Sequence, residues 1–222
     1  AELEARVAAA LERNRTAPAN AAVTARALVA AEADGLSGHG LQRVASYAAQ
    51  ARVGKIDGFA TPALSRPAAA VATVDAAHGF AYPALDAAAA ALVETVPATG
   101  VAAAPVQRSH HAGAVGHVVE RLAQAGAAAL LFANSPPAIA PWGGKRALFG
   151  TNPIAFAAPR PDGAPVVVDR SRSKVARGKV VAARARGEAI PAGWAFDGDG
   201  RATTDPAAAL AGTMAPLGDA KG

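Results

Sequence analysis

The chain has 222 residues, a length that suits one large domain or one domain and part of another, and 52% of the residues are apolar. It contains no cysteine, which excludes structural disulfides and thiolate metal or redox sites. The formal net charge is +5, but the cations are scattered and lack aromatic stacking partners, which argues against nucleic-acid binding.

The N-terminal segment AELEARVAAALERN has the pattern of a charged amphipathic helix and lacks the apolar core of an export signal. No stretch of the sequence reaches the roughly 18 uninterrupted apolar residues of a membrane span. We therefore expect a cytoplasmic protein that makes no membrane contact.

Helical periodicity dominates the first part of the chain. Leu3, Val7 and Leu11 recur at helix spacing, and a second helix is predicted over residues 19–33 after the break at Pro18. A glycine-punctuated turn, residues 34–40, follows. The spacing then predicts a third helix that begins at or just after His39 and ends near residue 54.

Short apolar runs alternate with helical patterns from residue 69 onward. Strands are predicted at residues 69–76, 101–107 and 128–134, with helices at 82–96 and 116–125 between them. The runs NPIAFAAP and APVVVD are separated by RPDG, which is good turn chemistry, so a hairpin is expected there. These patterns predict an α/β fold with N-terminal helices and a mixed sheet.

A polar run from Trp142 to Lys179 interrupts the alanine-rich sequence. Glycine, asparagine, threonine, serine, aspartate, lysine and arginine lie there between two short apolar strands. Polar loops carried by rigid strands commonly form binding sites. This run is therefore the first candidate for chemistry.

His39 lies between two glycines near a predicted helix start, and Arg43 follows four residues later. An imidazole beside a guanidinium and free backbone N–H groups could bind a carboxylate and deliver a proton. The alternative is that His39 is a turn residue and Arg43 a solvated surface charge. Spacing alone leaves both interpretations open.

The segment RSHHAGAVGH contains His110, His111 and His117 directly after a predicted strand. Adjacent histidines on a loop point in different directions, and no carboxylate with ligand spacing accompanies them, so no metal site is expected. A loop between a strand and a helix suits backbone contacts to a phosphate or an amide. It could equally be an ordinary polar connection.

Two further positions follow from the polar run. Asp169 ends an apolar strand, where a carboxylate could orient a histidine and raise its pKa, or could pair with Arg170. Thr151 and Asn152 form either a tight turn or a ligand contact. The sequence has no GxGxxG after a strand, no Walker lysine motif and no GxSxG elbow, which argues against a Rossmann nucleotide site and a serine hydrolase.

A set of motifs spread over nearly the whole chain resembles the malate/L-lactate dehydrogenase family. In chain order they are GLSGHGLQR, RSHHAGAVGH, ANSPPAIAPWGG, FGTNPIAF, VVVDRSRSKVARGK, IPAGWAFDGDGRATTDP and PLGDAKG. The resemblance implies an NAD- or NADP-dependent reductase of small 2-oxo acids, such as those related to malate and lactate, or of cyclic imino acids. It also implies a non-Rossmann cofactor fold and a homodimer.

The resemblance assigns roles by matching position. It makes His39 the proton donor, Asp169 the carboxylate that works with it, and Arg43 and Thr151 substrate contacts. The cofactor contacts that it implies are His111, Gly113, Ser171, Ser173 and Lys221. The implied reaction is hydride transfer between the nicotinamide and a carbonyl or imine carbon, with proton transfer at His39.

Three features depart from the family pattern. Gly38 stands where members have a serine before the histidine, so Ser37 would have to supply that hydroxyl. Arg172 replaces a small polar residue, and its charge would favour the 2′-phosphate of NADP. The sequence ends at Gly222, where family members continue, so we expect a fragment or a truncated chain.

The resulting domain prediction assigns residues 1–65 to the helical part of a substrate domain and residues 66–222 to a C-terminally truncated NAD(P)-binding α/β domain. The expected partner is a small carboxylate substrate. Two alternatives to a dehydrogenase remain at this point: a catalytically impaired nucleotide-binding remnant of the family, and a basic RNA-associated protein.

Overall fold

A computed structural model describes the backbone of residues 1–221 and the side chains of residues 1–220. The protein divides into two compact units. Unit 1 comprises Ala1–Ala129 and Phe156–Val167, and unit 2 comprises Leu130–Ala155 and the chain from Val168 onward. The fold is mixed α/β with small sheets, as the alternation of apolar runs and helical patterns predicted.

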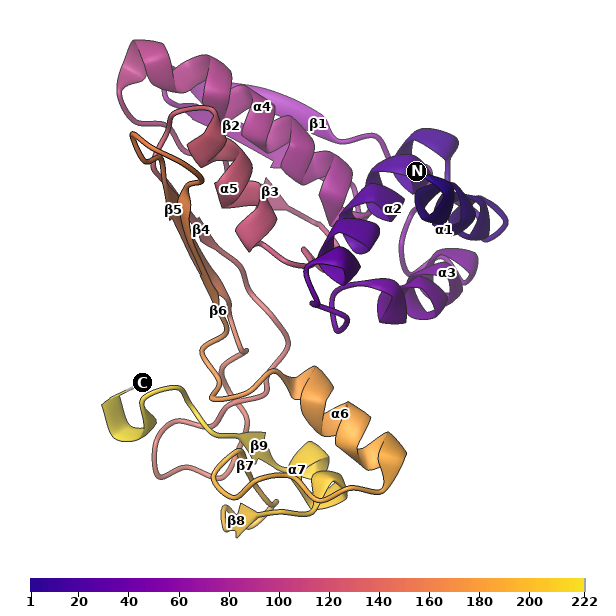
Figure 1. The fold of residues 1–222 in the computed structure, drawn as a ribbon, viewed down its shortest axis with the longest axis vertical. Helices are drawn as coiled ribbons and strands as arrows, with labels where there is room; N and C mark the ends of the chain where they lie inside the picture. Colours follow the sequence, from indigo (N-terminus) through magenta and orange to yellow (C-terminus); the bar gives the residue numbers. More distant parts are fainter. Residues whose placement is uncertain (222) are drawn as a thin grey trace. The chain divides into compact units, whose positions relative to one another are not determined.

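Unit 1 begins with three helices, α1 (Glu2–Glu12), α2 (Pro18–Ala33) and α3 (Val44–Arg52), which lie together in Figure 1. Leu11, Leu28 and Tyr47, one from each helix, are at most 1% exposed and belong to one core cluster. Alanines fill most of the remaining contacts, so the helices approach closely and bury little area per residue. The predicted third helix starts later than expected, because a 3₁₀ turn, η1 (Leu41–Arg43), precedes α3.

The α/β part of unit 1 contains β1 (Ala63–Ala68), β2 (Val71–Asp75), α4 (Ala81–Thr99), β3 (Val106–Gln107) and α5 (Gly116–Gln124). The strand order is β1-β2-β3, with β1 antiparallel and β3 parallel to β2, which makes this sheet mixed. The helix α4 packs against β2 (Figure 1), where Val74 meets Ala84 and Ala88. Alternation along β2 buries Ala72 and Val74 on one face.

The sequence pattern did not predict β1, and it predicted a longer strand than β3. Every residue of β1 is exposed, and the strand contains Pro67, which cannot donate to the ladder. The pairing shifts register between Ser65 and Ala68, around that proline. In the predicted strand 101–107, only Val106 and Gln107 form a ladder, although Ala103 adds an isolated bridge to Val71.

The strands β4 (Ala129–Phe132), β5 (Ile154–Ala158) and β6 (Val166–Arg170) form a second small sheet in that order. The two runs predicted to form a hairpin are therefore neighbouring strands, β5 and β6. The remainder of unit 2 contains α6 (Arg177–Arg186), β7 (Ala195–Phe196), β8 (Ala202–Thr203), α7 (Pro206–Ala211), β9 (Thr213–Met214) and η2 (Asp219–Lys221). Its central strand β7 pairs antiparallel with both β8 and β9.

Two buried threonines on helices of unit 1 differ in their hydrogen bonds. Replacing each with valine should therefore change the free energy of unfolding in opposite directions. Thr24 on α2 is fully buried, and within the described residues its hydroxyl oxygen has no hydrogen-bond partner. Because an unpaired buried hydroxyl is costly, Thr24→Val should raise the free energy of unfolding by about 1 kcal/mol. Urea denaturation followed by circular dichroism measures the change.

Thr95 on α4 provides the matched control. Its hydroxyl donates to Ala91 O at 2.7 Å and accepts from Arg66 Nη1 at 2.8 Å. Thr95→Val removes both bonds and should lower the free energy of unfolding by about 2 kcal/mol. The same sign of change in both variants would contradict this account of the two hydroxyls.

Candidate functional site

Aromatic and imidazole side chains gather in unit 1, where the turn after α2, the helix α3, the start of α4 and the loop before α5 meet. The cluster comprises His39, Tyr47, Tyr82, His110 and His111, and we call it the histidine–tyrosine cluster. It holds both tyrosines of the chain and three of its five histidines. A chain with 5% aromatic residues thus concentrates its polar rings at one place.

The rings of His39 and His111 are stacked, with centroids 5.4 Å apart and planes 9° from parallel. The hydroxyl of Tyr47 lies 2.7 Å from His111 Nδ1, a short hydrogen-bond distance. The hydroxyl of Tyr82 lies 3.5 Å from that of Tyr47, at the outer limit of a hydrogen bond. The predicted proton donor and the predicted cofactor-contacting histidine therefore lie face to face.

His110 meets the edge of the same tyrosine. Its ring centroid is 4.8 Å from that of Tyr47 at an interplanar angle of 81°, and it also packs edge-on against Phe80. His110 Nε2 lies 3.3 Å from Gln50 Oε1, whereas His110 Nδ1 is buried and has no hydrogen-bond partner among the described residues. An orphaned buried ring nitrogen indicates a place where a polar ligand atom could be accommodated.

Burial and neighbouring cations keep two of these imidazoles neutral. The pKa of His111 falls to about 3, first because burial disfavours its charged form and then because the Arg43 charge and the other two histidines lie close. Burial, Lys55 and Arg43 lower the pKa of His110 to about 4. Burial also raises the pKa values of both tyrosines, so their hydroxyls keep their protons.

The turn that carries His39 is held by Glu32 of α2. One carboxylate oxygen accepts from Leu41 N at 2.8 Å, and the other accepts from Ser37 Oγ at 2.9 Å. A Cβ on Gly40 would lie 2.3 Å from Glu32 Oε2, which explains a glycine there. The Ser37 hydroxyl, expected to replace the serine that Gly38 lacks, donates to Glu32 and is committed to shaping the turn.

Arg43 closes the other side of this turn. Its Nε donates to Gly38 O at 2.6 Å, and the residue is half-buried. His39 lies in the turn before η1, so His39 and Arg43 are not on one helical face as their spacing predicted. A tertiary arrangement brings the Arg43 charge near His111, His110 and Tyr47.

The loop before α5 requires glycine at residue 113. Gly113 has φ +68°, and a Cβ there would lie 2.3 Å from the Tyr82 hydroxyl. This close approach seats Tyr82 beneath the predicted cofactor loop. His117, the third histidine of the motif, instead contacts Asp34 with Nε2 2.8 Å from Oδ2.

Unit 2 contains the predicted residues of the polar run. The Thr151 hydroxyl lies 3.0 Å from Ser135 Oγ, and Thr151 O accepts from Arg172 N at 2.7 Å. Asn152, at φ +32°, accepts from Ser135 N at 3.0 Å. Thr151 is therefore part of a bonded junction between the loop after β4 and the loop after β6.

The two serines of the Asp-x-Ser-x-Ser stretch contact each other. Ser171 Oγ and Ser173 Oγ are 2.7 Å apart, and the Ser173 hydroxyl donates to Val175 O. Asp169 lies in β6 and is exposed. Its predicted partnership with His39 joins residues of different units and stays a prediction, and the side chain of Lys221 lies outside the described residues.

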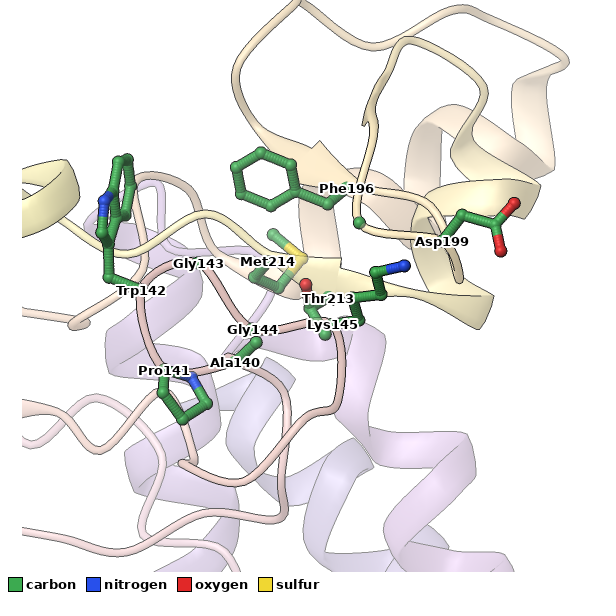
Figure 2. A pocket seen from close by; sticks show the side chains of 11 residues that line it. Ala140, Pro141, Trp142, Gly143, Gly144, Lys145, Phe196, Asp199, Thr213 and Met214 are labelled. Atoms are coloured by element: carbon green, nitrogen blue, oxygen red, sulfur yellow. The ribbon is translucent and has the colours of Figure 1, made fainter.

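The start of the polar run lines a cavity of about 270 Å³ within unit 2 (Figure 2). Trp142, Phe196 and Met214 contribute its large apolar walls, and Lys145 and Asp199 contribute charges. The backbone of the Gly143–Gly144 pair completes one side. None of the predicted site residues lines this cavity, so the polar run supplies two separate features, this cavity and the Thr151 junction.

Sequence reasoning did not single out Tyr47, Tyr82, Gln50 or Ser135. A tyrosine on an apolar helix face predicts core packing, and indeed both tyrosine rings are buried. The available signal was composition, because the chain has only two tyrosines, and Tyr47 lies four residues after the motif GLSGHGLQR. Ser135 falls within the motif ANSPPAIAPWGG, but nothing in its spacing pointed to Thr151.

Comparison with known proteins gives the family. The profile of the malate/L-lactate dehydrogenase family matches residues 1–222. The chain belongs to this family. The family resemblance drawn from the sequence motifs is thereby confirmed.

The names of several curated relatives specify a substrate. The chain is 52% identical over 221 residues to a (2R)-3-sulfolactate dehydrogenase (NADP(+)) of Chromohalobacter salexigens, covering 100% of this chain and 66% of that protein. It is 43% identical over 203 residues to a Delta(1)-pyrroline-2-carboxylate reductase of Ancylobacter novellus, covering 91% and 60%. The chain thus spans somewhat under two thirds of the length of these relatives.

Solved structures share the fold. A delta1-piperideine-2-carboxylate reductase from Pseudomonas syringae pv. tomato superposes with a TM-score of 0.94 at 39% identity, covering 99% of this chain and 66% of that one. A sulfolactate dehydrogenase from Methanocaldococcus jannaschii gives a TM-score of 0.87 at 29% identity, covering 99% and 63%. Among the described residues, no helix is long and apolar enough to cross a membrane.

The low pKa of His111 predicts how stability depends on pH. The folded state holds His111 and His110 neutral down to about pH 3 and pH 4, whereas the unfolded chain protonates them near 6.5. Between these values the unfolded state binds more protons, so the free energy of unfolding should fall as pH is lowered from 6.5 toward 4. His111→Gln removes one of the two groups and should make this fall shallower.

Urea denaturation midpoints measured at several pH values from 7.5 to 4.5 test this expectation. The wild-type protein and the variant are compared in the same buffers and at the same ionic strength. An equally steep pH dependence in His111→Gln would show that this histidine is not held neutral by the fold.

Proposed function

We propose that the protein is an NADP-dependent oxidoreductase that interconverts a small 2-hydroxy acid and its 2-oxo acid, with 3-sulfolactate as the leading substrate. The observation that carries this proposal is the 52% identity to an NADP(+)-dependent (2R)-3-sulfolactate dehydrogenase, which extends over 221 residues of the chain. The histidine–tyrosine cluster supports it, because it provides a candidate proton donor beside a cation.

The donor set of this chain fits a nicotinamide nucleotide. The orphaned nitrogen of His110 and the neutral ring of His111 offer hydrogen-bonding atoms suited to an amide or a phosphate oxygen. His111, Gly113, Ser171, Ser173 and Lys221 would hold the nucleotide, and the Arg172 charge would favour a 2′-phosphate. When bound, this cofactor would supply or accept the hydride.

The substrate side of the proposal rests on charge and proton placement. Arg43 would bind the carboxylate through charge-assisted hydrogen bonds, and Thr151 would contact the same molecule. His39 would hold the proton that the reduced oxygen takes up, and Asp169 would stabilise the imidazolium. Because His111 stays neutral at the face of His39, it adds no competing charge there.

A cyclic imino acid is the second substrate candidate. The 43% identity to a Delta(1)-pyrroline-2-carboxylate reductase favours it, as does the 0.94 TM-score with a delta1-piperideine-2-carboxylate reductase. Both classes place a carboxylate next to the carbon that receives hydride, so Arg43 and His39 would play the same parts. Malate and lactate remain candidates through the family assignment alone.

The organisation of the enzyme is also proposed. Residues 1–65 would belong to the substrate region and residues 66–222 to a non-Rossmann cofactor region, since no GxGxxG follows a strand. The enzyme would be a cytoplasmic homodimer. Gly38 and the commitment of Ser37 to Glu32 favour one alternative, a remnant that binds nucleotide without turnover.

A substrate panel separates these possibilities. We expect NADPH fluorescence to change on binding, with weaker binding of NADH. We also expect NADPH oxidation to be fastest with 3-sulfopyruvate and slower with Δ1-pyrroline-2-carboxylate, Δ1-piperideine-2-carboxylate, oxaloacetate and pyruvate. Fastest turnover of a cyclic imine would move the assignment to that class, and nucleotide binding without turnover of any of them would establish the remnant.

His39→Gln tests the proton donor directly. Glutamine keeps a polar side chain of similar length but cannot transfer a proton at neutral pH. We expect kcat to fall about 10²–10⁴-fold while the dissociation constant of NADPH changes little. Steady-state kinetics and nucleotide fluorescence measure the two quantities, and an undiminished kcat would remove His39 from the mechanism.

A further inference from the structure

The buried hydroxyls of Tyr47 and Tyr82 form a short chain that ends on His111. The hydrogen-bond distances are 3.5 Å between the two hydroxyls and 2.7 Å from Tyr47 to His111 Nδ1. The ring of Tyr47 is 1% exposed and that of Tyr82 is 8% exposed, so water does not readily replace these partners. The direction of this chain decides which nitrogen of His111 carries the proton.

Each hydroxyl has one proton to donate, and burial keeps both hydroxyls protonated. Among the described residues, the Tyr47 oxygen is the one recorded hydrogen-bond partner of the Tyr82 hydroxyl. If Tyr82 donates to Tyr47, the Tyr47 proton is left for His111 Nδ1, over the shorter of the two distances. If Tyr47 instead donated to Tyr82, the Tyr82 proton would have no acceptor among these partners. The Tyr47 proton would then go to the more distant of its two partners.

We propose that Tyr47 is a positioning residue whose hydroxyl donates to His111 Nδ1 and fixes His111 as the neutral tautomer with its proton on Nε2. The ring that stacks on His39 is then a hydrogen-bond donor of defined orientation. Whatever polar atom His111 Nε2 contacts must be an acceptor, such as a carbonyl, carboxylate or phosphate oxygen.

This assignment gives the two stacked imidazoles, His39 and His111, different roles in proton transfer. With Nδ1 occupied by Tyr47 and Nε2 already protonated, His111 has no free lone pair in the ring plane to accept a proton. If His39 is the proton donor, which rests on the proposed function, His111 cannot share the proton with it. Tyr47 thus acts on the reaction through His111, without touching the reacting atoms itself.

Nitrogen-15 NMR of histidine-labelled protein reads the tautomer without nucleotide or substrate. In the wild-type protein at pH 7.5, we expect the His111 signals to show a protonated Nε2 and an unprotonated, hydrogen-bonded Nδ1. The His111→Gln spectrum assigns these signals. A proton on Nδ1 in the wild-type protein would overturn the proposal.

Tyr47→Phe keeps the ring that packs against Phe80 and His110 but removes the hydroxyl. We expect the His111 Nδ1 signal to shift and the second tautomer to become populated. Tyr82→Phe is the matched control, since it removes the other tyrosine hydroxyl and leaves the 2.7 Å bond in place. It should keep the wild-type tautomer, and an unchanged His111 spectrum in Tyr47→Phe would contradict the proposal.

A binding measurement adds a second readout. Losing the fixed donor should weaken NADPH binding about tenfold in Tyr47→Phe, the loss expected when one hydrogen bond is no longer held in place. The tautomer measurement tests the role of Tyr47, and the activity measurement tests the proposed function, so one proposal can be refuted without the other. A wild-type protein with the proton on Nε2 but no turnover would refute the proposed function and leave the role of Tyr47 intact.

Discussion

The hydrogen bond from Tyr47 to His111 is the contact on which the geometry of the candidate site depends. Tyr47 belongs to α3 and is part of the core that α1 and α2 form, whereas His111 belongs to the loop that leads into α5. One bond of 2.7 Å therefore connects the N-terminal helical core to the loop of the α/β part of unit 1. The stacking of His39 on His111 follows from it, because the loop presents a ring of fixed orientation.

The composition of the chain makes this arrangement possible. Alanines such as Ala21, Ala25 and Ala51 fill the contacts between the helices, and their small side chains need little space. Large rings are then few, and the helical core places Tyr47 and Phe80 at its boundary with the polar cluster. The same rings that close the apolar core also form the walls around His110 and His111. Core packing and site geometry therefore share residues, and a substitution there affects both.

The sequence predicted most helices of the fold because their apolar periodicity is local. It missed β1, whose exposed residues and Pro67 carry no strand pattern, and it placed a long strand where only Val106 and Gln107 form a ladder. At the site, spacing singled out His39, Arg43 and the loop of His111 as candidates, and the family resemblance added Gly113; in unit 1 these residues lie around one cluster. Tyr47 was not found, since its role depends on a partner 64 residues away that no local pattern encodes.

The turn that carries His39 keeps its backbone conformation although Gly38 lacks the hydroxyl that family members have before the histidine. Glu32 holds the backbone of this turn through Leu41 N and Ser37 Oγ, so the conformation does not need a side chain at residue 38. The carbonyl of Gly38 still accepts from Arg43, which keeps that guanidinium next to the turn. The missing hydroxyl before His39 therefore leaves the conformation of the turn unchanged. It removes one possible proton relay. The neutral ring of His111 still stacks on His39, and the Arg43 charge lies close to His111.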